Sequence, residues 1–396
     1  MTSIVNLRQS REGRGHRGVQ IDGKLKMKKR LLYIVNVDWF FISHRIEIAR
    51  AAINSGYEVH LACEVTDKLD LIEDMGIFVH KTPSMRGFRI LSSILLISRI
   101  TNIIRSVRPD VIHCVTIKPI LIGGIVARLF AVRKVVLAIS GLGSAFGSTG
   151  LIASVRRVFA QYLYNIATSN QNSYIIFQNK DDEEVVKRFT TIEDCRRTLI
   201  SGSGVNLQKF VATPMPRGIP MIVLVSRLLL DKGLAEFVEA AQIVRASGYT
   251  AQFAIAGTPD PSSPSSVSPV VLEKWQAESS VRFLGHVGDV AELYRRSTIV
   301  CLPSYYREGV PLSLIEAAAA GRAIVTTNHP GCRDTIIPDK TGKLVPPKDP
   351  VALARAFCDL LEDRALVASM GRNARAFAEQ KFSLERVVRE HLEIYG

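Results

Sequence analysis

Short apolar runs alternate with longer helical segments along this chain, and that alternation limits the folds it can adopt. In the first half, the runs expected to be strands are separated by segments with the length and apolar periodicity of helices. Such a pattern is typical of a parallel sheet with helices on both faces, whose ligands bind at the carboxyl ends of the strands. The strands predicted here are residues 31–37, 57–63, 77–80, 111–114, 134–139, 174–177 and 198–200.

The alternation stops at residues 202–220, where several prolines indicate a linker, and then restarts. A chain of 396 residues is also too long for one ordinary domain. We therefore predict an N-terminal domain at 31–205, a linker at 206–220 and a C-terminal domain at 221–380, facing each other across a cleft. A last helix within residues 381–396 is expected to pack back on the N-terminal domain. The strands predicted in the second half are residues 221–225, 252–256, 281–284, 298–302 and 323–327.

The cysteines and acidic residues argue against a metal centre. The six cysteines are scattered without any Cys-x-x-Cys spacing, which favours free thiols in a reducing compartment over a disulfide framework or a zinc site. The chain has no His-Glu-x-x-His pattern and no Asp-x-Asp pair, so the usual short clamp for a nucleotide-bound divalent metal is missing. We expect no metal and no other cofactor.

Positive charge is concentrated at the start of the chain. The formal net charge is +14, and residues 1–30 supply half of that excess. This segment has no apolar run, so it is not a signal peptide, and its composition predicts a disordered basic tail. Met27 precedes the first predicted strand and is expected to be the natural start, unless residues 1–26 are a genuine basic arm.

The remaining positive charge favours anionic partners such as nucleotides, lipid diphosphates or an anionic membrane surface, and we expect no nucleic-acid partner. The longest uncharged run, residues 135–155, is interrupted throughout by glycine and serine. No membrane-spanning helix is therefore expected.

The stretch from Glu308 to Gly321 predicts an anion site. It follows a predicted buried strand, Pro311 is suited to the first turn of a helix, and Gly321 is suited to its end. Glu308 and Glu316 would flank this helix start, and carboxylates beside an anion suit a ligand with hydroxyl groups, such as a nucleotide sugar. The alternative is an alanine-rich core helix with two solvated glutamates. The free backbone N–H groups expected to face the anion are those of Val310, Leu312 and Ser313.

Three further segments lie at predicted strand ends of the second half. Arg227 and Lys232 follow one strand, where two fixed cations suit a leaving diphosphate, although a solvated basic turn is the alternative. Gly285 and His286 follow another strand, where a base could stack or hydrogen-bond, although His286 alone would more often be a surface histidine. The turn at residues 330–334 is predicted to point at the same edge.

Together these segments resemble the family 4 retaining glycosyltransferases of the GT-B fold, and the resemblance covers residues 31–396. It implies two Rossmann-like parallel-sheet domains facing a cleft. The motifs that carry it are Arg227…Lys232-Gly233, Phe283-Leu-Gly285, Pro303-Ser304, Glu308-Gly-x-Pro311…Glu316-Ala-x-Ala-x-Gly321 and Gly331.

The spacing of Glu308 and Glu316 is similar to the E-x7-E element of that family. The resemblance implies that Arg227 and Lys232 hold the nucleotide diphosphate, that Glu308 contacts the transferred sugar, and that Glu316 contacts the ribose. It also implies that the backbone from Gly309 to Ser313 binds phosphate.

The acceptor side is predicted from the first half. Residues 38–45 occupy the first predicted strand–helix turn, where many relatives have a glycine-rich loop, and are similar to members that extend polyprenyl-diphosphate-linked sugars in bacterial polysaccharide assembly. The alternative is a helix over residues 44–55 capped by Ser43, with His44 packed under Trp39. Many relatives have a histidine near the position of Ser140, and this chain has none. The candidate acceptor residues are Asp38, His44, Arg45, Lys118 and Ser140.

The predicted helix at residues 90–107 is the candidate for a membrane surface. Its polar face carries Arg105 and continues to Arg108, Arg99 lies at the boundary, and the other face is apolar. The helix either covers the sheet or also contacts an anionic membrane.

These expectations combine into one function, with two alternatives. We expect a retaining hexosyl- or N-acetylhexosaminyltransferase that moves a sugar from a UDP-linked donor to a polyprenyl-diphosphate-linked acceptor. Without a metal, we expect Arg227 and Lys232 to stabilise the leaving group and a donor phosphate oxygen to take the acceptor proton. The expected location is the inner face of the cytoplasmic membrane, bound peripherally. The alternatives are a nucleotide-sugar epimerase of the same fold and a non-catalytic peripheral membrane protein that binds nucleotides.

Overall fold

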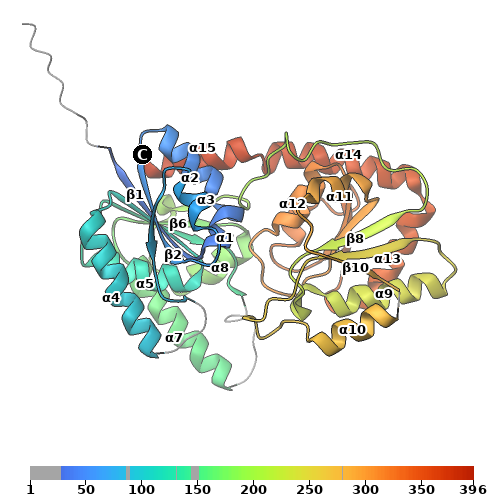
Figure 1. Cartoon of the computed structure of the whole chain (residues 1–396), viewed down its shortest axis with the longest axis horizontal. Coiled ribbons are helices and arrows are strands. Elements are labelled where there is room, and N and C mark those ends of the chain that lie inside the picture. Colours follow the sequence, from blue (N-terminus) through green and yellow to red (C-terminus); the bar gives the residue numbers. More distant parts are fainter. Residues whose placement is uncertain (1–27, 86–89, 131, 144–150, 279) are drawn as a thin grey trace, which may run out of the picture.

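The computed structural model describes residues 28–85, 90–130, 132–143, 151–278 and 280–396. In these residues the chain forms two parallel sheets flanked by helices (Figure 1). The predicted α/β class with two parallel-sheet domains is confirmed.

The N-terminal sheet has seven described strands in the order β3-β2-β1-β4-β5-β6-β7. Along β1, Leu32 and Ile34 pack into the core on one face, while Leu31, Tyr33 and Val35 pack into the core on the other. Both faces are buried because side chains alternate along a strand and helices cover both sides. The strands are β1 (Arg30–Val37), β2 (Glu58–Glu64), β3 (Phe78–Lys81), β4 (Val111–Val115), β5 (Lys134–Ile139), β6 (Ser173–Phe177) and β7 (Arg197–Leu199).

Helices follow most of these strands. The helices are α1 (Asp38–His44), α2 (Ile46–Asn54), α3 (Leu69–Glu73), α4 (Ile90–Val107), α5 (Ile117–Arg128), α7 (Leu151–Thr168), α8 (Lys180–Lys187) and the 3-10 helix η1 (Asp194–Arg196).

The C-terminal sheet has six described strands in the order β10-β9-β8-β11-β12-β13, and the last strand was not expected from the sequence. The strands are β8 (Met221–Val225), β9 (Gln252–Ala256), β10 (Arg282–Gly285), β11 (Ile299–Leu302), β12 (Ala323–Thr327) and β13 (Gly342–Val345). The helices are α9 (Leu234–Ala246), α10 (Pro269–Ala277), α11 (Val290–Arg296), α12 (Leu312–Ala319), α13 (Pro350–Glu362), α14 (Arg364–Lys381), α15 (Leu384–Tyr395) and the 3-10 helices η2 (Leu230–Lys232) and η3 (Arg333–Thr335).

Two predicted boundaries near the start of the chain are wrong. Residues 1–27 of the predicted tail lie outside the described residues, but Arg30 already belongs to β1, where its backbone N–H bonds Asp110 at 2.9 Å. Helix α1 begins at Asp38, directly after β1, so residues 38–44 are helical and not a turn. The helix predicted at residues 44–55 is observed as α2, with Arg45 and not Ser43 at its capping position. Ser43 lies inside α1, where its hydroxyl donates to the Trp39 carbonyl at 3.0 Å.

The last helix, α15, lies against the N-terminal domain beside α2 (Figure 1). Its terminal Tyr395 is buried, and the tyrosine hydroxyl lies 2.9 Å from that of Tyr33 on β1 and 2.6 Å from Nδ1 of His113 on β4. Because buried polar groups cost free energy unless they are hydrogen-bonded, this network fixes where the helix docks. The end of the chain thus crosses back from the C-terminal domain and ties the two domains together.

Candidate active site

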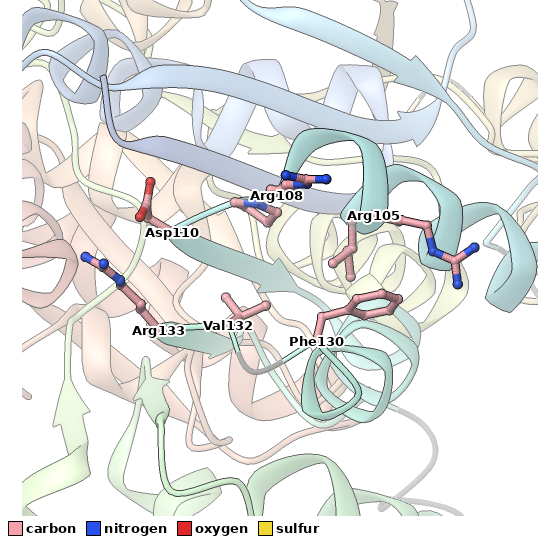
Figure 2. Close-up of a pocket in the computed structure, with 8 residues that line it drawn as sticks. Arg105, Arg108, Asp110, Phe130, Val132 and Arg133 are labelled. Atoms are coloured by element: carbon pink, nitrogen blue, oxygen red, sulfur yellow. The ribbon is translucent and has the colours of Figure 1, made fainter. Parts of the chain in front are cut away.

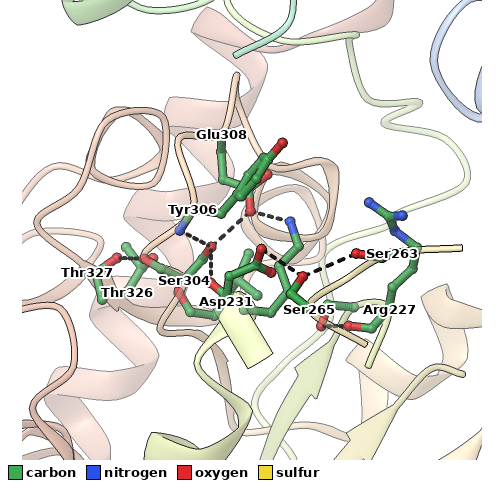
Figure 3. Close-up of polar contacts among 12 residues, drawn as sticks. Arg227, Asp231, Ser263, Ser265, Ser304, Tyr306, Glu308, Thr326 and Thr327 are labelled. Carbon is green, nitrogen blue, oxygen red and sulfur yellow. Dashed lines mark hydrogen bonds and ion pairs between the residues drawn. The ribbon is translucent and has the colours of Figure 1, made fainter. Parts of the chain in front are cut away.

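A buried ion pair joins the two segments that the sequence singled out in the C-terminal domain. The amine of Lys232 contacts the carboxylate of Glu308, and both side chains are almost buried, with 12% and 13% exposed (Figure 3). The Ser304 hydroxyl also donates to the same Glu308 oxygen at 2.9 Å. A charged pair withdrawn from water must be held in good geometry to be tolerated, and here a third group completes it.

The backbone around Lys232 accounts for this placement. Lys232 ends the turn η2, and Gly233 follows with a φ of +77°, a conformation that favours glycine. A Cβ at Gly233 would overlap the carbonyl of Pro303, so the turn lies directly against the end of β11. The Asp231 carbonyl accepts hydrogen bonds from the Ser304 hydroxyl at 3.1 Å and from the Tyr305 N–H at 3.0 Å. Lys232 and Glu308 are therefore held by two joined loops.

Arg227 reaches from the end of β8 toward the N-terminal domain. Its guanidinium bonds Asp260 at 2.6 Å and lies 5.6 Å from the centre of the Trp39 ring. Burial alone would raise the pKa of Asp260, but hydrogen bonds from Ser262 and Arg227 lower it. About half of the Arg227 side chain is exposed, so the cation remains accessible to an anionic ligand.

The helix predicted after Glu308 is present as α12, and the anion site at its start stays a prediction. Pro311 occupies the capping position rather than the first turn, and Gly321 follows the helix end with a φ of +72°. The Val310 N–H is not free as predicted, because it donates to Oε1 of Gln178 in the N-terminal domain at 3.0 Å. Leu312 and Ser313 begin the helix, so their N–H groups remain candidates for phosphate.

Glu316 lies one turn into α12 and is largely withdrawn from water. Burial raises its pKa to about 8, and the Lys209 charge lowers it only partly. At neutral pH this carboxyl is therefore mostly protonated, whereas an ionised carboxylate is the better acceptor for ribose hydroxyls.

We expect the Glu316 carboxyl to make donor binding pH-dependent, because the ribose contact predicted for it needs a hydrogen-bond acceptor. We expect UDP to bind roughly tenfold more tightly at about pH 8.5 than at about pH 6.5, since hydroxyl donors favour the ionised form.

Because the folded state holds this proton more tightly than the unfolded chain, ionisation also destabilises the fold as pH rises from about 4.5 toward 8. Calorimetry on wild type and Glu316→Gln checks both effects. The variant corrects for titration of UDP itself, and an equal pH dependence in both proteins would contradict the assignment.

Gly285 and His286 lie at the end of β10, two strands from Arg227, and both are exposed. The Gly285 carbonyl accepts a 2.7 Å hydrogen bond from Gly257, which in turn packs against the backbone of Ser226. The surroundings of Gly285 are open, which leaves space for a flat ligand. A nucleotide base at this strand end stays a prediction.

Asp38 does not face an acceptor as predicted. Its buried carboxylate accepts hydrogen bonds from the Trp39 N–H at 2.7 Å, from the Thr66 N–H and hydroxyl, each at 2.7 Å, and from the Lys68 N–H at 3.2 Å. These bonds occupy the carboxylate in joining α1 to the end of β2.

His44 and Arg45 are adjacent in the chain; His44 is partly buried and Arg45 is fully buried. His44 stacks on Phe40 with ring centres 4.1 Å apart, and not under Trp39 as the alternative held. Burial and the charges of Arg45, Arg227 and Lys232 lower the pKa of His44 to about 3, so its ring is neutral. Arg45 is 2% exposed and donates to Ser140 at 3.3 Å and to Ser203 at 3.0 Å. Arg45 is thus buried in this structure, and a direct contact with a lipid diphosphate stays a prediction.

Lys118 lies buried in the first turn of α5, where burial lowers the pKa of its amine.

A separate cavity of about 340 Å³ lies at the opposite edge of the N-terminal sheet, where β4 and β5 begin (Figure 2). Arg105, Arg108 and Arg133 line it, but their guanidinium groups point in different directions. This cavity therefore lies away from the strand ends of the C-terminal domain, where the donor is predicted to bind.

Sequence reasoning missed the contacts that the N-terminal domain makes with the Glu308 loop, residues 305–310. Arg307 bonds Asp182 at 2.9 Å, and Asn179 donates to the carbonyl of Glu308 at 3.3 Å. Asn179 also caps α8, accepting from the Asp182 N–H, and this capping pattern was the only signal in the sequence. The capping pattern indicates a helix start but not its distant partners.

Two family models match the two halves of the chain. The model described as "Glycosyl transferase 4-like" matches residues 30–179, and the model described as "Glycosyl transferases group 1" matches residues 208–377. The first match ends just before α8, and the second begins within the linker that precedes β8.

Relatives and solved structures agree with these matches. The chain is 25% identical to the N,N'-diacetylbacillosaminyl-diphospho-undecaprenol alpha-1,3-N-acetylgalactosaminyltransferase of Campylobacter jejuni subsp. jejuni serotype O:2, over 90% of this chain and 97% of the relative. It is 22% identical to the UDP-Gal:alpha-D-GlcNAc-diphosphoundecaprenol alpha-1,3-galactosyltransferase of Escherichia coli, over 86% of this chain and 89% of that relative. The structure resembles a sucrose-phosphate synthase from Thermosynechococcus elongatus, with a TM-score of 0.77 and 19% identity over 93% of this chain and 98% of that chain. With both halves matched and both domains arranged in the GT-B fold, this chain belongs to the group 1 and 4-like glycosyltransferases.

Proposed function

We propose that this enzyme transfers a sugar from a UDP-linked donor to a sugar carried on a polyprenyl diphosphate, with retention at the anomeric carbon. The observation that carries the proposal is the buried Lys232–Glu308 pair beside the start of α12, with Arg227 close by. Two cations and a helix start suit a diphosphate, and a carboxylate next to them suits sugar hydroxyls. The names of two relatives, which specify undecaprenyl-diphosphate-linked sugars, support the acceptor class.

In the proposed reaction, the bond between the anomeric carbon and the diphosphate oxygen breaks while the acceptor hydroxyl forms the new glycosidic bond. Lys232 and Arg227 stabilise the charge that develops on the leaving UDP. Glu308 orients the sugar, and Glu316 holds the ribose. The acceptor proton passes to a phosphate oxygen of the leaving group.

The donor is tested by screening UDP-sugars for binding and then incubating each binder with lipid-linked acceptors. We expect at least one UDP-sugar to bind and to give a glycosylated lipid. Binding of UDP-sugars without transfer to any lipid-linked acceptor would favour a non-catalytic nucleotide-binding protein instead.

We propose that the reaction needs no metal, because the chain lacks an Asp-x-Asp clamp and supplies two cations of its own. Turnover should persist in excess chelator, and added magnesium or manganese should raise it less than twofold, by rough estimate. A complete loss of turnover in chelator that either metal restores would contradict this proposal.

We also propose that the enzyme binds peripherally to the inner face of the cytoplasmic membrane through α4 and α7. None of the helices that the structure describes is long and apolar enough to cross a bilayer. Helix α4 buries Leu96, Ile100 and Val107 against the sheet, so the helix covers the sheet as expected from the sequence. The same helix exposes apolar side chains, as does α7, and both extend to the lower edge of the domain in Figure 1. The exposed apolar residues are Ile94, Leu95, Ile97, Val158, Phe159 and Tyr162.

Positive charge follows the exposed side chains of Ile94, Leu95 and Ile97 along the same helix, starting at Arg99. Arg99, Arg105 and Arg108 are all exposed along α4 and just after it. Apolar side chains beside arginines are what an interfacial helix presents to an anionic bilayer. Binding of α4 to the bilayer would bring a lipid-linked acceptor to the N-terminal domain.

A further inference from the structure

We propose that the start of α8 positions the Glu308 loop from the opposite domain, so that the donor site is complete only when the two domains are in contact. We call Gln178, Asn179 and Asp182 the α8 latch. The inference rests on the proposed function in taking Glu308 as the residue that orients the sugar. Glu308 touches the substrate in that scheme, and the latch residues act only as positioning residues.

The latch holds the backbone of the loop by hydrogen bonds. The Gln178 side-chain oxygen accepts from the Val310 N–H at 3.0 Å, in a buried position. The Asn179 amide donates to the carbonyls of Glu308 and Gly309 at 3.3 and 3.4 Å. The consecutive backbone groups that directly follow the Glu308 side chain are therefore bound by the N-terminal domain.

A buried ion pair adds charge to these contacts. Arg307 bonds Asp182 at 2.9 Å, with 18% of the arginine side chain and none of the aspartate side chain exposed. Burial raises the pKa of Asp182, while Arg307 and Asn179 act in the opposite direction. Removing either partner would leave an uncompensated buried charge, so substitution of Asp182 or Arg307 is costly, and separation of the domains breaks a close charged hydrogen bond.

The fit between the loop and the N-terminal domain is close. A Cβ at Gly309 would overlap the Gln178 side-chain oxygen and would lie 2.9 Å from the backbone carbon of Ser140. A Cβ at Gly141 would lie 2.6 Å from the carbonyl oxygen of Arg307. Only glycine allows the two backbones to approach this far.

Glu308 is thus shared between domains. Its backbone carbonyl contacts Asn179 of the N-terminal domain, while its carboxylate contacts Lys232 and Ser304 of the C-terminal domain. A displacement of the latch would move the carboxylate relative to the bound sugar, and misplacement by about 1 Å costs about 100-fold in rate. The α8 latch therefore links the contact between the two domains to the geometry of the donor site.

The test compares four variants on α8 and just before it. Gln178→Met removes the acceptor for the Val310 N–H, Asp182→Asn removes the buried charge, and Glu184→Gln changes an exposed residue of the same helix as the matched control. We expect the first two to lower kcat by roughly 10- to 100-fold while the Kd of UDP changes by less than about threefold. Gln178→Glu, which keeps an acceptor oxygen, should recover most of the lost turnover. The control should match wild type.

Small-angle scattering of the same proteins without substrate reports domain contact independently of the sugar transferred. We expect a larger radius of gyration for Gln178→Met and Asp182→Asn than for wild type and Glu184→Gln. If wild type transfers sugar and both latch variants keep its kcat and its radius of gyration, the latch proposal is wrong. If wild type transfers no sugar but the latch variants expand, the proposed function fails while the latch stands. If kcat, the number of UDP molecules bound per protein and the melting temperature all fall together, the substitutions have damaged the whole fold, and the positioning role is overturned.

Discussion

Lys232→Ala is expected to lower turnover by about 10²- to 10³-fold, the usual cost of removing a preorganised group that stabilises developing charge. Two effects act together, because the variant loses a cation at the leaving diphosphate and leaves the Glu308 carboxylate without its ion-pair partner. Lys232→Arg keeps a charge and should lose less. The measurement is kcat under saturating donor and acceptor.

Lys274→Ala is the matched control, since that lysine is 75% exposed on α10. The melting temperature of Lys232→Ala should show a folded protein, so that the loss can be assigned to chemistry. Turnover within about threefold of wild type would show that Lys232 has no role in stabilising the leaving group.

Changing Arg99, Arg105 and Arg108 together to glutamate is expected to weaken binding to anionic vesicles by well over tenfold. Each arginine near an anionic surface contributes about 1 kcal/mol, and reversal replaces attraction with repulsion. The effect should be largest at low salt, where screening is weakest. Co-sedimentation with vesicles measures it, while calorimetry with UDP should show unchanged donor binding because that site lies in the other domain.

A matched triple variant of Arg217, Arg355 and Arg372 to glutamate makes the same charge change on exposed residues of the linker and the C-terminal domain. It should bind vesicles nearly as well as wild type. Equal vesicle binding by all three proteins would mean that α4 only covers the sheet. Loss of both vesicle and UDP binding would indicate that the substitutions damaged the fold.

The C-terminal half of the candidate site was accessible from the sequence because its parts lie at strand ends. Parallel strands bring their carboxyl ends to one edge, so residues after β8 and β11 can be predicted to meet without knowing any contact. Lys232 and Glu308 are the clearest case, because they are 76 residues apart and yet form one ion pair. The roles of these residues toward a donor remain predictions.

The N-terminal half was less predictable because its polar side chains find partners that no local pattern reveals. Asp38 has the type and position of an acceptor ligand, but a loop after β2 occupies its carboxylate. Asp182 and Gln178 meet partners 125 and 132 residues away in the other domain. Contacts between domains depend on how the two sheets are docked, and hydrophobic periodicity specifies each sheet but not that docking.

The most direct test is a single incubation of the purified enzyme with a UDP-sugar, a polyprenyl-diphosphate-linked sugar and excess chelator, followed by mass analysis of the lipid and by NMR of the lipid-linked sugar and the nucleotide sugar. A parallel incubation omits the lipid. We expect a lipid heavier by one sugar residue, release of UDP in equal amount, retention of the anomeric configuration of the donor, and negligible change of the UDP-sugar without acceptor. Conversion of the UDP-sugar to an isomer without acceptor, as an epimerase would perform, or an unchanged lipid with every UDP-sugar that binds, would contradict the proposed function.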